Sequence, residues 1–208
     1  MSSQQNLGRI RGFSLLEILI VLAIFSFIVG GIFTTLDQSQ VRYQFEQEVA
    51  EVQQSARNAI DIMEREIRLA GFPKASYYSS TQNWTGANSN RVAQGFITIA
   101  ASNLVFEADI EEDGIVERVD YNFANGTLSR SAADKLAGGG APAADYKVLA
   151  ENVTALTFTY RDADHAATAA VAQVRSVGIS ISMRTPNVDP ASRQPRTITA
   201  QSEASVRN

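Results

Sequence analysis

Residues 13–36 form a continuous apolar run with a single ionisable side chain, Glu17. A helix of about 20 apolar residues crosses the hydrocarbon core of a bilayer, so this run predicts one transmembrane helix. A carboxylate inside such a helix is costly. It indicates either a functional residue or an acid near enough to the edge to reach the lipid headgroups. The run therefore predicts a membrane anchor with one acid that needs an explanation.

The charges beside the run predict its orientation. Arg9 and Arg11 precede it, and Asp37 follows it. Because positively charged flanks favour the cytoplasm, we expect a cytoplasmic N-terminus and the bulk of the chain on the other side. A secretory signal peptide is the alternative interpretation. Its apolar segment is shorter and ends at a small-x-small cleavage site, and residues after 36 contain no such site.

Apolar positions continue beyond the membrane segment in alternating steps of four and three, which is one stripe of a helix. We therefore expect an amphipathic second half of the same helix over residues 37–72. Gly71 and Pro73 predict where it ends. The stripe comprises Phe45, Val49, Val52, Ala56, Ala59 or Ile60, Met63, Ile67 and Ala70.

The remaining chain, residues 73–208, reads as strands separated by turns. Asp113-Gly114 and Asn125-Gly126 are dipeptides typical of tight hairpins. We predict an α+β fold in which the amphipathic half of the helix packs on one face of a mostly antiparallel sheet. The expected strands are 95–100, 103–110, 115–123, 153–160, 174–183 and 196–206, and segments 74–90, 136–145 and 185–195 are expected to be irregular.

Composition excludes several kinds of function. The net charge is -4 with no long basic block, so we predict no direct nucleic-acid binding. The absence of cysteine excludes disulfides and thiol catalysis. With a single histidine, His165, no catalytic constellation is evident, and we predict a non-enzyme without a cofactor. Asp162, Asp164 and His165 form either a weak metal site or, the favoured interpretation, a solvated acidic turn.

Residues 109–120 resemble the start of a calcium loop, with Asp109, Glu111 and Asp113 at alternate positions and a glycine at the sixth. The pattern departs from that loop at its third place, and it has Asp120 instead of glutamate at the twelfth. An acidic hairpin turn at Asp113-Gly114 explains the same residues. We therefore predict no metal site and keep these four acids as weak candidates.

The N-terminal residues carry a family resemblance. A short basic leader ends in Gly12, and Phe13 and Glu17 follow at the start of the apolar run. This arrangement resembles the type IV pilin and pseudopilin superfamily. Within it, residues 55–72 look like the end of the long helix in PilW-type minor pilins. The strand segments near residues 148–162 and 174–185 also resemble sheet segments of both the PilW-type group and J-type minor pseudopilins.

The resemblance implies a maturation pathway. Prepilin peptidase would cut between Gly12 and Phe13, remove the leader 1–12 and methylate the new amine of Phe13. Glu17 would then form an assembly salt bridge with the N-terminal ammonium of a neighbouring subunit. Two opposite charges in a low-dielectric helix bundle attract strongly, whereas either alone is costly.

The resemblance also implies where the protein acts. We expect a single-pass protein of the bacterial inner membrane with a periplasmic domain, later part of a pilus fibre at the cell surface. Its function would be that of a minor, tip-associated pilin that primes assembly. Its partners would be prepilin peptidase, other minor pilins, the major pilin, the inner-membrane assembly platform and membrane lipid. The alternative is a J-type minor pseudopilin of a type II secretion system.

Overall fold

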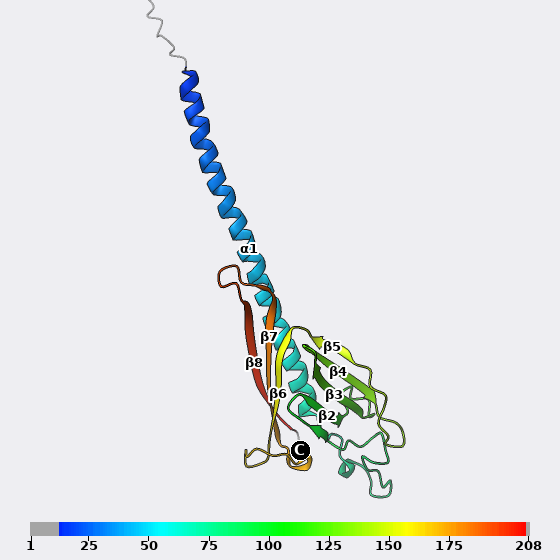
Figure 1. Ribbon diagram of the computed structural model, residues 1–208. Coiled ribbons are helices and arrows are strands. Elements are labelled where there is room, and N and C mark those ends of the chain that lie inside the picture. Colours follow the sequence, from blue (N-terminus) through cyan, green and yellow to red (C-terminus); the bar gives the residue numbers. More distant parts are fainter. Residues whose placement is uncertain (1–12, 207–208) are drawn as a thin grey trace, which may run out of the picture. The chain divides into compact units, whose positions relative to one another are not determined.

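The computed structural model describes residues 13–206. The chain divides into two units, residues 1–44 and residues 45–208, and helix α1 (Leu15–Arg68) supplies residues to both (Figure 1). In the first unit, large apolar side chains of α1 are exposed along the predicted membrane segment. The helix is long and apolar enough to cross a membrane, judged by length and composition.

In the second unit, α1 buries the predicted stripe. Every position of the stripe, including both Ala59 and Ile60, is less than 9% exposed. Steps of three and four keep these side chains on one face of the helix, so a single stripe can be buried along its whole length. The helix ends at Arg68, and Gly71 follows with a φ of +82°, a conformation that favours glycine. The predicted amphipathic half extended four residues further, to residue 72.

The strands form two antiparallel sheets, each with its strands in chain order. Figure 1 shows the two sheets beside the second half of α1. The first sheet contains β1 (Phe96–Ile99), β2 (Asn103–Ala108), β3 (Glu117–Ala124), β4 (Thr127–Asp134) and β5 (Lys147–Ala150). The second contains β6 (Val153–Arg161), β7 (Ser176–Val188) and β8 (Pro195–Ser205).

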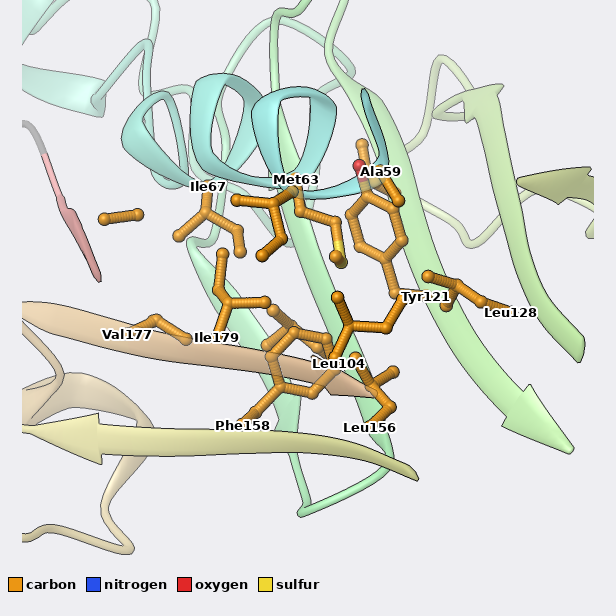
Figure 2. Close-up of a cluster of buried hydrophobic side chains, with 14 of the residues drawn as sticks. Ala59, Met63, Ile67, Leu104, Tyr121, Leu128, Leu156, Phe158, Val177 and Ile179 are labelled. Carbon is orange, nitrogen blue, oxygen red and sulfur yellow. The ribbon is translucent and has the colours of Figure 1, made fainter. Parts of the chain in front are cut away.

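Both sheets share one hydrophobic core with α1. Figure 2 shows Met63 and Ile67 of the helix pointing toward apolar side chains of the strands. Because the two sheets contribute to the same core, neither can separate from the helix without exposing apolar surface. The strand residues drawn there are Leu104, Tyr121 and Leu128 from the first sheet, and Leu156, Phe158, Val177 and Ile179 from the second.

The segment after α1 lies beside β2 and hydrogen-bonds to it. The Gly71 amide donates to the Glu107 carbonyl at 2.9 Å, and the Asp109 amide donates to the Phe72 carbonyl at 2.9 Å. Residues 104–108 are all buried, so both faces of the strand are covered. This double burial explains why the sequence of β2 after Asn103 is a continuous apolar run broken only by Glu107.

The α+β fold class is confirmed, but the prediction of one sheet is wrong. Strands β4 and β5 were not predicted because they lack a clean apolar alternation; Leu128 is the only large apolar side chain in β4. Segment 185–195 is also more regular than predicted. Strand β7 extends to Val188, and its register with β8 shifts between Arg184 and Val188, where Pro186 cannot donate to the ladder.

One of the two predicted hairpins is confirmed. Asn125 and Gly126 have φ values of 53° and 79°, and they connect the paired residues Ala124 and Thr127 of β3 and β4. The hairpin at Asp113-Gly114 is wrong. Strand β2 ends at Ala108 and β3 begins at Glu117, so a longer loop over residues 109–116 joins them. The acids of residues 109–116 therefore lie in a loop and not in a two-residue turn.

Candidate functional site

The first turn of α1 begins immediately after Phe13 and Ser14. The Ser14 carbonyl accepts hydrogen bonds from the amides of Glu17 at 3.0 Å and Ile18 at 3.2 Å, which closes this turn. The Phe13 side chain is 79% exposed. Gly12 and the remainder of the predicted leader lie outside the described residues. The structure thus starts the helix two residues after the predicted cleavage point.

Glu17 is the acid of the first helical turn, and its side chain is exposed. Free backbone amides at a helix N-terminus favour a negative charge there. Within residues 13–206, Glu17 forms no ion pair. A carboxylate on an otherwise apolar helix surface can therefore accept a cation from another molecule.

A second acid of α1, Glu66, lies inside the second unit. It is 4% exposed and accepts hydrogen bonds from the Tyr121 hydroxyl and from two nitrogens of Arg130. Burial, together with the charge of Glu66 and the hydrogen bond to it, raises the pKa of Tyr121 well above its usual value. The sequence pattern does not predict this cluster. Glu66 lies three residues after Met63 and four residues before Ala70, so helical spacing places it on the buried face of α1.

The loop between β2 and β3 brings together Asp109, Asp113 and Glu117, with one carboxylate oxygen from each within 4.8 Å of the others. Asp109 and Glu117 are buried, whereas Asp113 is exposed. Burial and the neighbouring charges of Asp109, Asp113 and Glu111 raise the pKa of Glu117 to about 7, against the opposing hydrogen bond from the Ile110 amide. Two of the four predicted candidates are therefore close together, joined by an unpredicted third acid.

The other two predicted candidates lie outside this cluster. Asp120 is on β3, where it accepts hydrogen bonds from the side-chain Nδ2 of Asn103 at 2.9 Å and from the Tyr146 hydroxyl at 2.6 Å. Glu111 is exposed in the loop and is not part of the grouped carboxylates. Asp120 is thus engaged by other side chains and does not join the grouped carboxylates, unlike the twelfth residue of a calcium loop.

The acidic segment around His165 forms a turn. Asp162 accepts hydrogen bonds from the amides of Asp164 and Ala166, both at 2.9 Å, and His165 has a φ of 60°. These contacts match the favoured interpretation of an acidic turn, since the Asp162 carboxylate stabilises backbone amides. Among residues 13–206, these three side chains do not form a metal-like group.

Comparisons with known proteins first define the class. The prokaryotic N-terminal methylation motif matches residues 7–33, which include Gly12, Phe13 and Glu17. This motif and the helix that follows it are those of the type IV pilin superfamily. No curated protein matches the chain in sequence. Among solved structures, a type IV-like pilin, TTHA1219 from Thermus thermophilus, is similar at 10% identity and a TM-score of 0.49, covering 74% of this chain and 95% of its own.

A second family profile covers most of the chain. The profile described as prepilin peptidase-dependent protein B matches residues 46–207, which include the amphipathic part of α1 and both sheets. The chain therefore belongs to the family of prepilin peptidase-dependent protein B. Pilin-like proteins of this kind are structural proteins.

Proposed function

We propose that this chain is a minor type IV pilin, made as a prepilin and matured by prepilin peptidase. The enzyme cuts between Gly12 and Phe13, releases residues 1–12 and methylates the amine of Phe13. The observation that carries this proposal is the position of Glu17. It is an exposed acid in the first turn of an apolar helix, within the residues that match the methylation motif.

Glu17 then serves assembly. Maturation creates an ammonium group at Phe13, and packing of apolar helices removes both charges from water. The ammonium of one subunit and the Glu17 carboxylate of its neighbour compensate each other, because either charge alone would be costly in that environment. A subunit shifted along the fibre would lose this pair, so Glu17 sets the register of the incoming helix.

The same proposal assigns a topology. Residues 13–36 span the inner membrane, residues 37–72 form the amphipathic half of the helix, and residues 73–208 form the periplasmic domain. Arg9 and Arg11 hold the leader on the cytoplasmic face. Their removal eases extraction of the subunit by the inner-membrane platform. The protein works by packing against other pilins and not by catalysis.

A minor, tip-associated place is supported by the irregular outer parts of the domain. Two long segments contain little regular structure: residues 74–95, before β1, and residues 135–146, between β4 and β5. A subunit repeated along a whole fibre must present matching surfaces at each step, whereas a tip subunit needs fewer.

A J-type minor pseudopilin would share the leader, the helix and Glu17. A secretin and secretion genes beside this gene would favour that role.

Intact mass and N-terminal sequencing of protein from cells with and without prepilin peptidase test the maturation step. We expect wild type to begin at methylated Phe13 only when the peptidase is present. Gly12→Val should keep the leader, because a side chain beside the scissile bond obstructs cleavage. Gly8→Val, a matched change inside the leader, should be processed. A mature protein that retains Met1 with the peptidase present would refute the proposal.

The role of Glu17 has a separate test. Glu17→Ala should be cleaved and inserted normally but be absent from sheared fibres. Asp37→Ala removes another exposed acid of the same helix and should assemble as wild type does. Incorporation of Glu17→Ala at the wild-type level would contradict the assembly role while leaving the maturation step intact.

A further inference from the structure

We propose that Asp109, Asp113 and Glu117 form a calcium-binding site in the loop between β2 and β3. This inference concerns only the second unit and does not depend on the proposed function. It differs from the linear loop pattern, since Glu117 takes part and Asp120 does not.

The strands hold two of the three ligands in place. Ala108 at the end of β2 pairs with Glu117 at the start of β3, so Asp109 follows the last rung of the ladder. Asp113 lies in the middle of the connecting loop. One oxygen from each carboxylate lies within 4.8 Å of the other two. Ca²⁺ binds oxygen at about 2.3–2.6 Å, so opposite ligands of one ion are about 5 Å apart. The three oxygens can therefore contact the same ion without a change of the strands.

A second observation points to a missing ligand. Asp109 is 6% exposed, and its Oδ1 atom accepts no hydrogen bond from residues 13–206. Its other oxygen, Oδ2, accepts the Gly114 amide at 3.0 Å. A buried carboxylate oxygen without a partner is costly, since it has lost water and gained nothing in return. A cation between the three carboxylates would supply the missing interaction.

The charges of the cluster are also uncompensated. Within residues 13–206, no lysine or arginine forms an ion pair with these three carboxylates. The engaged oxygens accept backbone amides instead: Glu117 Oε2 accepts Ile110 at 2.7 Å, and Asp113 Oδ1 accepts Ile115 at 2.8 Å. A proton on Glu117 would relieve part of the repulsion, as its raised pKa indicates. A divalent ion would offset two of the three negative charges.

The shape of the site favours Ca²⁺ over Mg²⁺. Asp113 is exposed, so water can reach the ion and complete a coordination shell of six to eight oxygens. Asp113 lies in the connecting loop outside the strand ladder, so its position can adjust to the irregular coordination that Ca²⁺ accepts. Mg²⁺ demands near-ideal octahedral geometry at shorter distances.

Calorimetric titration of the full chain in detergent micelles at pH 8 tests the site, using calcium chloride after chelator treatment. We expect one Ca²⁺ per chain and at least tenfold weaker Mg²⁺ binding. Asp113→Asn keeps the exposed side chain's size and should weaken Ca²⁺ binding at least tenfold. Glu111→Gln removes the same charge from the same loop, outside the cluster, and should weaken it less than threefold.

Two results would overturn the inference. One is a wild-type protein that shows no binding heat and has the same melting temperature in chelator as in about 5 mM Ca²⁺. This concentration exceeds the dissociation constants of weak extracellular calcium sites. The other is an equal loss in Asp113→Asn and Glu111→Gln, which would indicate diffuse attraction of ions to the loop. Asp109→Asn, with its fold checked by circular dichroism, provides a second variant that should also weaken Ca²⁺ binding at least tenfold.

Discussion

The Tyr121 hydroxyl of β3 donates to the Glu66 carboxylate of α1 at 2.5 Å, although the two residues are 55 positions apart in sequence. Arg130 of β4 donates to the same carboxylate through Nε at 3.0 Å and Nη2 at 2.8 Å. One buried acid of the helix thus contacts two neighbouring strands. Rotation of α1 on the sheet by one position would leave these donors and the carboxylate unpaired.

Removal of Glu66 should destabilise the second unit. In Glu66→Ala, the partly buried Arg130 and the Tyr121 hydroxyl lose their acceptor. We expect a loss of about 2–3 kcal/mol, below the full effect of breaking a buried pair because Arg130 is one-quarter exposed and keeps some water. Urea unfolding of the full chain in detergent, followed by fluorescence of the single tryptophan, Trp84, measures the change.

A surface ion pair provides the control for Glu66. Arg196 and Glu46 lie 3.5 Å apart with about half or more of each side chain exposed. Arg196→Ala should change the unfolding free energy by no more than about 0.5 kcal/mol. Equal effects of Glu66→Ala and Arg196→Ala would show that the buried contacts add nothing to stability.

Lys135 should stabilise the contact between residues 86–92 and β2. Its side chain is fully buried, and Nζ donates to Glu107 at 2.6 Å, to the Val92 carbonyl at 3.2 Å and to the Gly86 carbonyl. Lys135→Met leaves the buried Glu107 charge without its cation, so we expect a loss of about 3–5 kcal/mol.

Limited proteolysis gives an independent measurement of the Lys135 contacts. Because two acceptors of Lys135 lie within residues 86–92, this segment should become cleavable in Lys135→Met. The exposed Lys147→Met should behave as wild type does. The double variant Lys135→Met/Glu107→Gln should recover part of the lost stability, because it removes the buried charge as well. No recovery would mean that the lysine acts through packing alone.

Tyr146 should make stability depend on pH in the alkaline range. The hydrogen bond to Asp120, with smaller effects of burial and of the Asp120 charge, raises the pKa of Tyr146 to about 12, despite the opposing charge of Arg118. The folded state therefore retains this proton longer than the unfolded state does. Its contribution is fully present below about pH 10 and is lost as pH rises toward 12. Melting temperatures of wild type and Tyr146→Phe should differ below pH 10 and converge by pH 12. A constant difference across that range would contradict this linkage.

A tip location predicts a low and localised abundance in fibres. Immunogold labelling of wild-type cells should place this protein at fibre ends, and deletion of its gene should reduce the number of fibres. Fibres that still form should have unchanged length and diameter. Labelling spaced along the shaft would contradict the tip location without contradicting the proposed processing at Phe13.

Local patterns in the sequence predicted the helix and the turn at Asn125-Gly126. The stripe from Phe45 to Ala70 depends only on helical periodicity, and the turn depends on two adjacent residues that tolerate positive φ. Division of the strands into two sheets depends on which strands pair. That choice is set by contacts between distant segments, such as the hydrogen bond from the Phe158 amide to the Ala101 carbonyl.

The same distinction applies to the charged clusters. Glu17 was found because its apolar neighbours are adjacent in sequence. Glu66 was missed because the donors that compensate its burial lie on β3 and β4. Glu117 was missed because the ladder between β2 and β3, and not the spacing of a calcium loop, brings it beside Asp109.

The long buried stripe of α1 has a mechanical consequence. Strands β7 and β8 run alongside the part of α1 that follows residue 45 (Figure 1), and the stripe from Phe45 to Ala70 is buried in the shared core. A pull on the helix at residue 45 along its axis therefore loads these contacts together, in shear. We expect single-molecule pulling from this end to require a higher rupture force than peeling the helix from Arg68, where contacts would fail in succession. Equal forces would contradict this expectation. A chain built in this way transmits tension from its helix to both sheets at once.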